Sequence, residues 1–272
     1  MTTGNEVIAR FERFCPQNLA ESWDHVGLQL GNPDRSVHKL MTTLDVRPEV
    51  VQEAIDRHVD FIFAHHPIMF HPAKNLDTRN PQNQMYADLL SHQITVYGAH
   101  TNLDAASGGM NDWLAEKLKL NDTRPLLNEG ETMGDGGSQG MGRVGMLDHP
   151  MNYQEFAQYC LEAFNLQGLR LIAPLTEHPV KRVAILGGSG GQFWPAAVKL
   201  GADAYVTGDV SYHVAHDMKA NNLLVADVGH HVEAVSIQGL ANLLNRFKHE
   251  DSWDFEIVQT KINTDPYQYI VK

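Results

Sequence analysis

The sequence runs twice through the same order of strand-like and helix-like segments, and this repeat restricts the fold more than any other feature. Residues 43–67 align with residues 185–210, and residues 94–104 align with residues 223–233. In each half, short apolar runs typical of buried strands alternate with amphipathic helical runs. Strands that are joined through helices usually run parallel. We therefore expect an α/β protein with internally duplicated α/β units, in which mostly parallel sheets are covered by helices.

A glycine-rich segment separates the two repeats. Residues 128–145 contain seven glycines and few apolar side chains, which is typical of a loop or a connection between domains. We predict that residues 1–125 and 234–272 form the first α/β domain and that residues 126–233 form the second. The alternating segment 252–272 is expected to return as a strand to the sheet of the first domain.

The composition excludes several classes of protein. Lys and Arg total 21 against 33 Asp and Glu, and the resulting net charge of −12 argues against a dedicated nucleic-acid binder. Only two cysteines occur, Cys15 and Cys160, so neither a disulfide framework nor a thiolate zinc cage is expected. The chain has no apolar run of the roughly 20 residues that a membrane span requires and no secretory leader pattern. We expect a soluble cytoplasmic protein with no membrane partner.

Five of the 15 histidines fall where the predicted parallel strands end. Ligands gather at the carboxyl ends of such strands. Three of the predicted strand ends carry histidine beside a second histidine or a carboxylate: His65–His66, His100 with Asp104, and His230 with Glu233. Imidazole and carboxylate together suit zinc, iron or manganese, and two ions about 3.5–4 Å apart can share such ligands. The sequence therefore predicts a metal site.

Each motif also has a plainer interpretation. A His-His pair at a strand end often only caps a loop by hydrogen bonding, but three such clusters at equivalent strand ends favour metal binding. The run GGSGGQF at 187–193 fails the dinucleotide pattern because Phe193 occupies the last glycine position, which favours a tight turn. His213 and His216 are expected on a solvent-exposed helix face. Met133, Met141 and Met146 are expected to pack rather than to bind.

Five segments occur in the order found in a known family: ESWDHVGLQLG, FAHHPIMF, GAHTNLDAASGGMND, GMGRVG and DVGHHVEAVSIQGLANLL. On these segments the chain resembles the GTP cyclohydrolase I type 2 homologue family, also described as Nif3-like dinuclear metal-centre proteins. The resemblance implies a Nif3-like duplicated α/β fold, a two-metal site and a ring-shaped homohexamer. The family's metal ligands fall on His65, His66, Asp104, His230 and Glu233. His100 matches a position close to the metals, which implies a catalytic or substrate-contacting role.

From this resemblance we expect two divalent metal ions per chain, of zinc, iron, manganese or nickel, in the cleft between the two domains. The family name suggests hydrolytic opening of the guanine ring of GTP, and hence a nucleotide or related small molecule as substrate. Arg143, Lys74 and Arg79 are the candidate cations for a triphosphate. The alternative is a non-catalytic hexameric scaffold or regulatory protein, which would bind metal without turnover.

Overall fold

The computed structural model describes residues 1–127 and 139–270, so most of the glycine-rich segment, including Met133, lies outside the described residues. The chain groups into two compact units. Unit 1 comprises Met1–Leu103 and Ala234–Asp265, and unit 2 comprises Asp104–Glu233 and Pro266–Lys272. None of the described helices is long and apolar enough to cross a membrane.

Unit 1 is built on a sheet with the strand order β1-β4-β3-β2-β11. Strands β11, β2, β3 and β4 are parallel neighbours, and β1 pairs antiparallel with β4. The strands are β1 (Gly27–Leu30), β2 (Lys39–Thr43), β3 (Phe61–Ala64), β4 (Thr95–Gly98) and β11 (Glu256–Gln259). The helices are α1 (Gly4–Phe14), the 3₁₀ turn η1 (Gln17–Leu19), α2 (Pro48–Asp56), α3 (Pro81–Ser91), α4 (Thr101–Ala105, which runs into unit 2) and α9 (Val235–Glu250).

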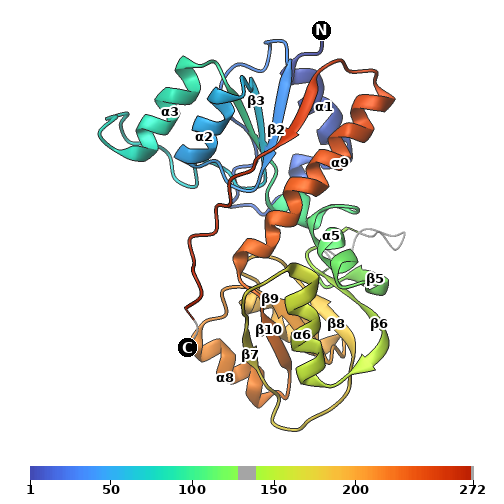
Figure 1. Ribbon diagram of the computed structural model, residues 1–272. Helices are drawn as coiled ribbons and strands as arrows, with labels where there is room; N and C mark the ends of the chain where they lie inside the picture. Colours follow the sequence, from blue (N-terminus) through green and yellow to red (C-terminus); the bar gives the residue numbers. More distant parts are fainter. Residues whose placement is uncertain (128–138, 271–272) are drawn as a thin grey trace. The chain divides into compact units, whose positions relative to one another are not determined.

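Helices cover both faces of the unit 1 sheet (Figure 1). On the face covered by α2 and α3, Met41, Ile62 and Val96 from three adjacent strands pack in one apolar cluster with residues of those helices. On the face covered by α1 and α9, Phe11 of α1 packs edge-on against Phe63, with ring centroids 4.7 Å apart. Because both faces of the central strands β3 and β4 are buried, their residues are mostly apolar and do not alternate with polar ones.

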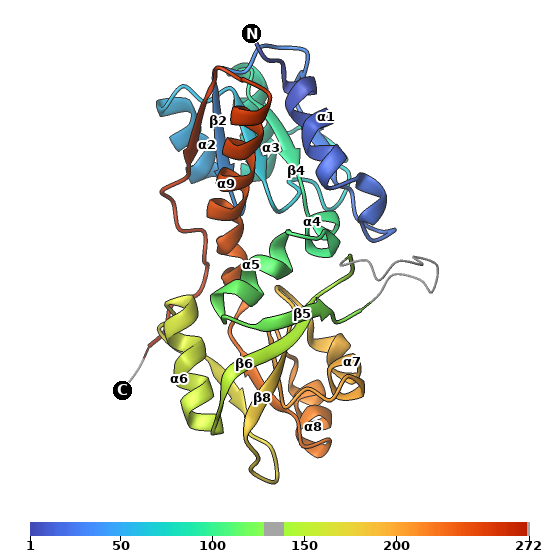
Figure 2. The same ribbon diagram turned by 90° about the vertical axis from the view of Figure 1, so that its right-hand side faces the viewer.

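Unit 2 contains a sheet with the strand order β5-β6-β8-β9-β10-β7, in which β8, β9 and β10 are parallel. Its strands are β5 (Asn121–Pro125), β6 (Arg143–Met151), β7 (Arg170–Ile172), β8 (Val180–Ile185), β9 (Ala204–Thr207) and β10 (Leu224–Asp227). The helices are α5 (Met110–Lys117), α6 (Tyr153–Phe164), η2 (Gly191–Phe193), α7 (Trp194–Lys199), α8 (Tyr212–Ala220) and η3 (His230–Ala234). Helix α6 lies on one face of this sheet, and α7 and α8 lie on the other (Figure 2).

The predicted fold class is confirmed, since β2-β3-β4 in unit 1 and β8-β9-β10 in unit 2 are both parallel triplets joined through helices. The C-terminal strand β11 returns to the first sheet beside β2, as the alternation predicted. Strands β5, β6 and β7 were not anticipated, because their residues lack a long apolar run. The predicted first domain included residues 104–125, but these group with unit 2, where β5 pairs with β6.

Candidate metal centre

Three histidines of unit 1 come together beyond the ends of two parallel strands. His65 and His66 directly follow β3, and His100 follows β4, which is the neighbour of β3 in the sheet. The imidazole ring centroids lie 4.9–5.5 Å apart. One nitrogen from each ring lies within 4.8 Å of a nitrogen from the other two, so these three residues can share a metal ion. The parallel pairing of β3 and β4 thus brings residues that are distant in the sequence together in one cluster.

An oxygen atom faces the Nδ1 atom of each of these rings. His65 Nδ1 lies 2.8 Å from the carbonyl oxygen of Ala99, and His66 Nδ1 lies 2.7 Å from Asp45 Oδ1. A carbonyl oxygen only accepts hydrogen bonds, so His65 Nδ1 carries a proton, and in the neutral ring Nε2 then carries the lone pair. This arrangement is typical of metal-binding histidines, whose second ring nitrogen donates to a carbonyl or a carboxylate.

Asp24 provides the oxygen that faces His100. Its Oδ2 atom lies 2.9 Å from His100 Nδ1 and accepts hydrogen bonds from the backbone N–H and the hydroxyl of Thr101. Burial raises the pKa of Asp24, but the hydrogen bonds from His100 and Thr101 outweigh it and lower the pKa from 3.8 to about 2. Asp24 is therefore ionised at neutral pH, with its Oδ2 atom facing the His100 ring.

The other predicted ligands, Asp104, His230 and Glu233, belong to unit 2. The 3₁₀ turn η3 places His230 and Glu233 on the same side, because residues three apart eclipse one another in such a turn. Their Nε2 and Oε2 atoms are 3.1 Å apart. Asp104 and Glu233 are both buried, and each offers an oxygen within 4.8 Å of the other. Carboxylate and imidazole are donor types that suit a divalent ion.

A carboxylate also orients His230. Asp209 Oδ2 lies 2.7 Å from His230 Nδ1 and accepts a hydrogen bond of 2.6 Å from the Ser189 hydroxyl. Burial raises the pKa of Asp209, but the hydrogen bonds from Ser189 and His230 prevail, so the pKa lies below its ordinary value. With its Nδ1 atom engaged by an ionised carboxylate, His230 presents Nε2 on the side of Glu233.

The glycine run after β8 makes room for Glu233. A Cβ atom on Gly188 would lie only 2.6 Å from Glu233 Oε1, and one on Gly187 would lie 3.1 Å from the same oxygen. Gly188 also has a φ of +62°, which a residue with a side chain rarely adopts. The run predicted as a tight turn therefore brings the backbone close to a carboxylate, which explains why these positions are glycine.

Both arginines among the three candidate cations for a triphosphate are paired with aspartates. Arg143 is 1% exposed and forms a two-pronged ion pair with Asp112. Its remaining N–H groups donate to three backbone carbonyls, those of Gly140, Gly142 and Ala106. Arg79 pairs with Asp77 and is 91% exposed, and Lys74 is exposed. Arg143 is thus a structural residue rather than a phosphate ligand.

Sequence reasoning did not assign roles to Asp24, Asp45 and Asp209. Asp45 and Asp209 each follow a parallel strand by two residues, so their position at a strand end could have indicated them. Asp24 lies in the loop before β1, within the segment ESWDHVGLQLG that carries the family resemblance, so that segment could have indicated it. His213 and His216, expected on an exposed helix face, are exposed on α8.

Comparison with known proteins places this chain among related sequences and structures. A family model described as Duf34/NIF3 (NGG1p interacting factor 3) matches residues 2–266. A Streptococcus pneumoniae protein named GTP cyclohydrolase 1 type 2 homolog is 39% identical over 269 residues, which cover 98% of this chain and 99% of that protein. A Lactococcus lactis protein of the same name is 37% identical over 97% of this chain and 98% of its own length. The crystal structure of a Bacillus cereus protein related to NIF3 superposes with a TM-score of 0.93 at 27% identity and covers 99% of both chains.

Proposed function

The chain belongs to the Duf34/NIF3 (NGG1p interacting factor 3) family, and from that membership and its donor groups we propose that it is a metal-dependent hydrolase. Its proposed substrate is a nucleotide or a related small molecule, in a ring-opening reaction of the GTP cyclohydrolase type 2 kind. The single observation that carries the proposal is that oxygen atoms engage the Nδ1 atoms of His65, His66 and His230, which prepares each ring to bind metal through Nε2.

We propose that two divalent ions are held by these three histidines together with two carboxylates. The full ligand set is His65, His66, Asp104, His230 and Glu233. The residues fit such ions because neutral imidazole and carboxylate suit zinc, iron, manganese and nickel. Bound divalent ions would supply positive charge. This charge would polarise a carbonyl oxygen of the substrate and lower the pKa of water, so that hydroxide becomes available at neutral pH.

The proposed role of His100 is to carry a proton between water and the substrate. Its Nδ1 atom faces the ionised Asp24, whose charge stabilises the imidazolium that forms when Nε2 accepts a proton. Asp24 also accepts from the backbone N–H of Thr101, which holds the carboxylate in place at the start of α4. The aromatic side chains of Trp23 and Phe70 contact the His100 ring edge-on, at centroid distances of 6.0 and 5.8 Å, and restrict its orientation.

A second candidate function is a metal-binding scaffold without turnover. The observation that favours it is the burial of Asp104 and Glu233, which are 7% and 3% exposed. Structural metal sites are closed in this way, whereas catalytic sites keep a coordination position for water or substrate. The two functions differ in one measurable respect, because only the hydrolase converts a substrate.

Elemental mass spectrometry of the untagged full-length protein tests the metal proposal. We expect about two equivalents of divalent metal per chain, because the five proposed ligands and added water complete two coordination shells. The His66→Ala variant is expected to retain fewer. Turnover of GTP and other nucleotides would then be screened with the loaded protein. Metal at background level even after reconstitution would refute both functions, and full loading without any turnover across the screen would favour the scaffold.

The carboxylates that face the Nδ1 atoms of the proposed metal-binding histidines give a more selective prediction. Asp209→Asn should weaken metal binding by about 10–100-fold. The asparagine side chain lacks the negative charge with which Asp209 accepts the hydrogen bond from His230 Nδ1–H. Competition with a chromophoric chelator measures the affinity. Asp217→Asn, on the exposed side of α8, serves as the matched control. Equal affinities for the two variants would show that Asp209 does not orient a metal-binding histidine.

A further inference from the structure

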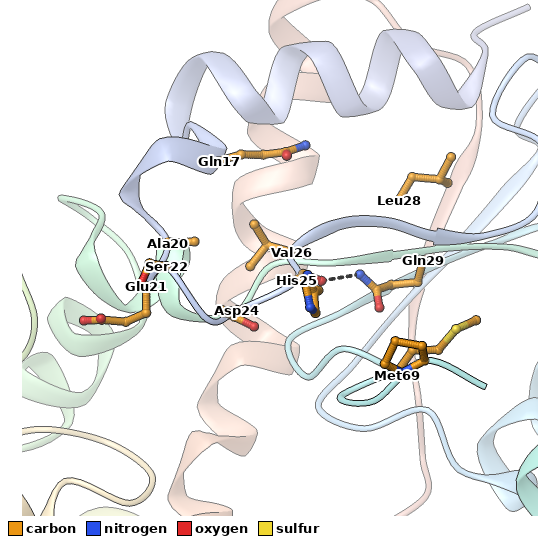
Figure 3. Close-up of a pocket in the computed structure, with 11 residues that line it drawn as sticks. Gln17, Ala20, Glu21, Ser22, Asp24, His25, Val26, Leu28, Gln29 and Met69 are labelled. Carbon is orange, nitrogen blue, oxygen red and sulfur yellow. Dashed lines mark hydrogen bonds between the residues drawn. The ribbon is translucent and has the colours of Figure 1, made fainter. Parts of the chain in front are cut away.

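Three histidines of the candidate metal centre each face a carboxylate that also accepts a hydrogen bond from a hydroxyl group. The hydroxyl, carboxylate and imidazole residues are Thr101, Asp24 and His100; Ser189, Asp209 and His230; and Thr264, Asp45 and His66. In the first set Thr101 directly follows His100, and Figure 3 shows Asp24 in the loop before β1. The third set differs, because its hydroxyl comes from a residue 219 positions after the aspartate, beyond the last strand.

The Asp45 carboxylate joins Thr264 to His66. The Thr264 hydroxyl donates to Asp45 Oδ2 at 2.5 Å, and Asp45 Oδ1 lies 2.7 Å from His66 Nδ1. Hydrogen bonds of this length to a carboxylate are among the strong ones in proteins. The two oxygens of a carboxylate are rigidly connected, so a hydroxyl that holds Oδ2 also fixes the direction in which Oδ1 points.

The backbone around Asp45 is held by the neighbouring strand ends. The Thr43 hydroxyl donates to the Asp45 carbonyl at 2.8 Å, and His66 N–H donates to the Leu44 carbonyl at 2.9 Å. Backbone contacts of this kind do not restrict rotation about the side-chain bonds of an aspartate. The Asp45 side chain is 26% exposed, so water competes for its oxygens. The Thr264 hydroxyl opposes this rotation and this competition.

The C-terminal segment, residues 260–265, is itself anchored to unit 1 where it leaves β11 (Figure 1). The Thr260 hydroxyl and the Lys261 backbone N–H both donate to the carboxylate of Glu53, at 2.6 and 3.0 Å. Ile262 packs against the apolar cluster beneath α2 and α3. The segment therefore has a defined course before it reaches Asp45, and Thr264 is presented from a fixed backbone.

We propose that Thr264 is a positioning residue for His66 and that the C-terminal segment thereby forms part of the metal centre. The Thr264 hydroxyl holds the Asp45 carboxylate, and this carboxylate keeps a proton on His66 Nδ1 and leaves Nε2 of the neutral ring available to a metal ion. The inference rests on the proposed function for its metal ion. It deepens that function by assigning a residue that acts only through Asp45.

Competition for Zn²⁺ with a chromophoric chelator tests the effect on metal binding in the full-length protein. Thr264→Val keeps the shape of the side chain and removes its hydroxyl, so we expect about tenfold weaker binding, the lower end for residues that orient a metal-binding histidine. Thr264→Ser keeps the hydroxyl and should bind as the unaltered protein does. Thr260→Val is the matched control, because it removes a hydroxyl of the same segment that bonds Glu53 and should leave the affinity unchanged.

NMR of the metal-free protein with ¹⁵N-labelled histidine tests the positioning of His66 directly. The ring N–H proton of His66 is assigned by its absence from the spectrum of His66→Ala. We expect this proton to exchange with water about tenfold faster in Thr264→Val than in the unaltered protein, because exchange requires the hydrogen bond to Asp45 to open. Thr264→Ser and Thr260→Val should retain slow exchange.

Three results would overturn the proposal: a His66 ring proton that exchanges too fast to be observed in the unaltered protein, unchanged exchange in Thr264→Val, or equal Zn²⁺ affinities for Thr264→Val and Thr260→Val. A merely structural role for Thr264 would lower the stability of both valine variants and separate them in neither measurement. Failure of the proposed function is recognised separately. If the unaltered protein bound no metal, that function would be refuted, and the exchange rates would still decide whether Thr264 positions His66.

Discussion

Replacing Arg143 by methionine is expected to lower the free energy of unfolding by about 3–5 kcal/mol, which is the usual cost of breaking a buried ion pair. The guanidinium is 1% exposed and bonds both oxygens of Asp112 at 2.6 and 2.7 Å. The carbonyls of Gly140, Gly142 and Ala106 would also lose their donor. Methionine has a comparable length but donates no hydrogen bond, so four acceptor groups would lose hydrogen bonds inside unit 2.

Urea denaturation followed by circular dichroism measures this change. Arg79→Met is the matched control, because Arg79 forms a two-pronged pair with Asp77 of similar geometry but is 91% exposed. Solvent screens such a pair, so we expect no measurable loss of stability. Arg143→Lys should remain strongly destabilised, because an ammonium group cannot reproduce the planar fork. If Arg143→Met unfolded at the same urea concentration as Arg79→Met, the structural role of Arg143 would be wrong.

Glu233→Ala is expected to reduce metal content and to lower turnover by on the order of 10³-fold or more, under the proposed hydrolase function. Glu233 is 3% exposed, lies 3.1 Å from His230 Nε2, and packs against the backbone of Gly187 and Gly188. Removing its carboxylate deletes one ligand and half of the negative charge that it and Asp104 provide. Elemental mass spectrometry and single-turnover kinetics report the two effects separately.

Two further variants separate metal binding from proton transfer. His231→Ala changes the histidine next to His230, which belongs to none of the potential ligand groups in the described residues, so metal content and turnover should both be unchanged. His100→Ala is expected to retain metal and to lose turnover, because the proposed role of His100 is to carry a proton rather than to bind metal. Loss of metal from His100→Ala would instead assign His100 as a ligand, a role that its place beside His65 and His66 also permits.

Much of the architecture could be predicted because a buried strand can be recognised from a short stretch of sequence. The strands β3, β4, β9 and β10 are buried along their whole length, and their residues form short, mostly apolar runs, as expected of strands covered on both faces of a sheet. The strands β5 and β6 could not be predicted in this way. They pair antiparallel with each other across the glycine-rich segment, and β5 is almost wholly exposed, so neither apolar content nor alternation indicated it.

The sequence by itself determined which metal-binding or catalytic residue types follow the strands, because the end of an apolar run can be recognised in the sequence. Parallel strands bring such ends to one edge of the sheet. His65 and His66 after β3, and His230 and Glu233 after β10, were found in this way. Only the tertiary structure decided which oxygen faces each imidazole and whether a charged side chain is buried. Asp24 meets His100, and Asp112 meets Arg143, across long stretches of chain. Such pairings depend on how loops and helices pack, and no local pattern of residues records them.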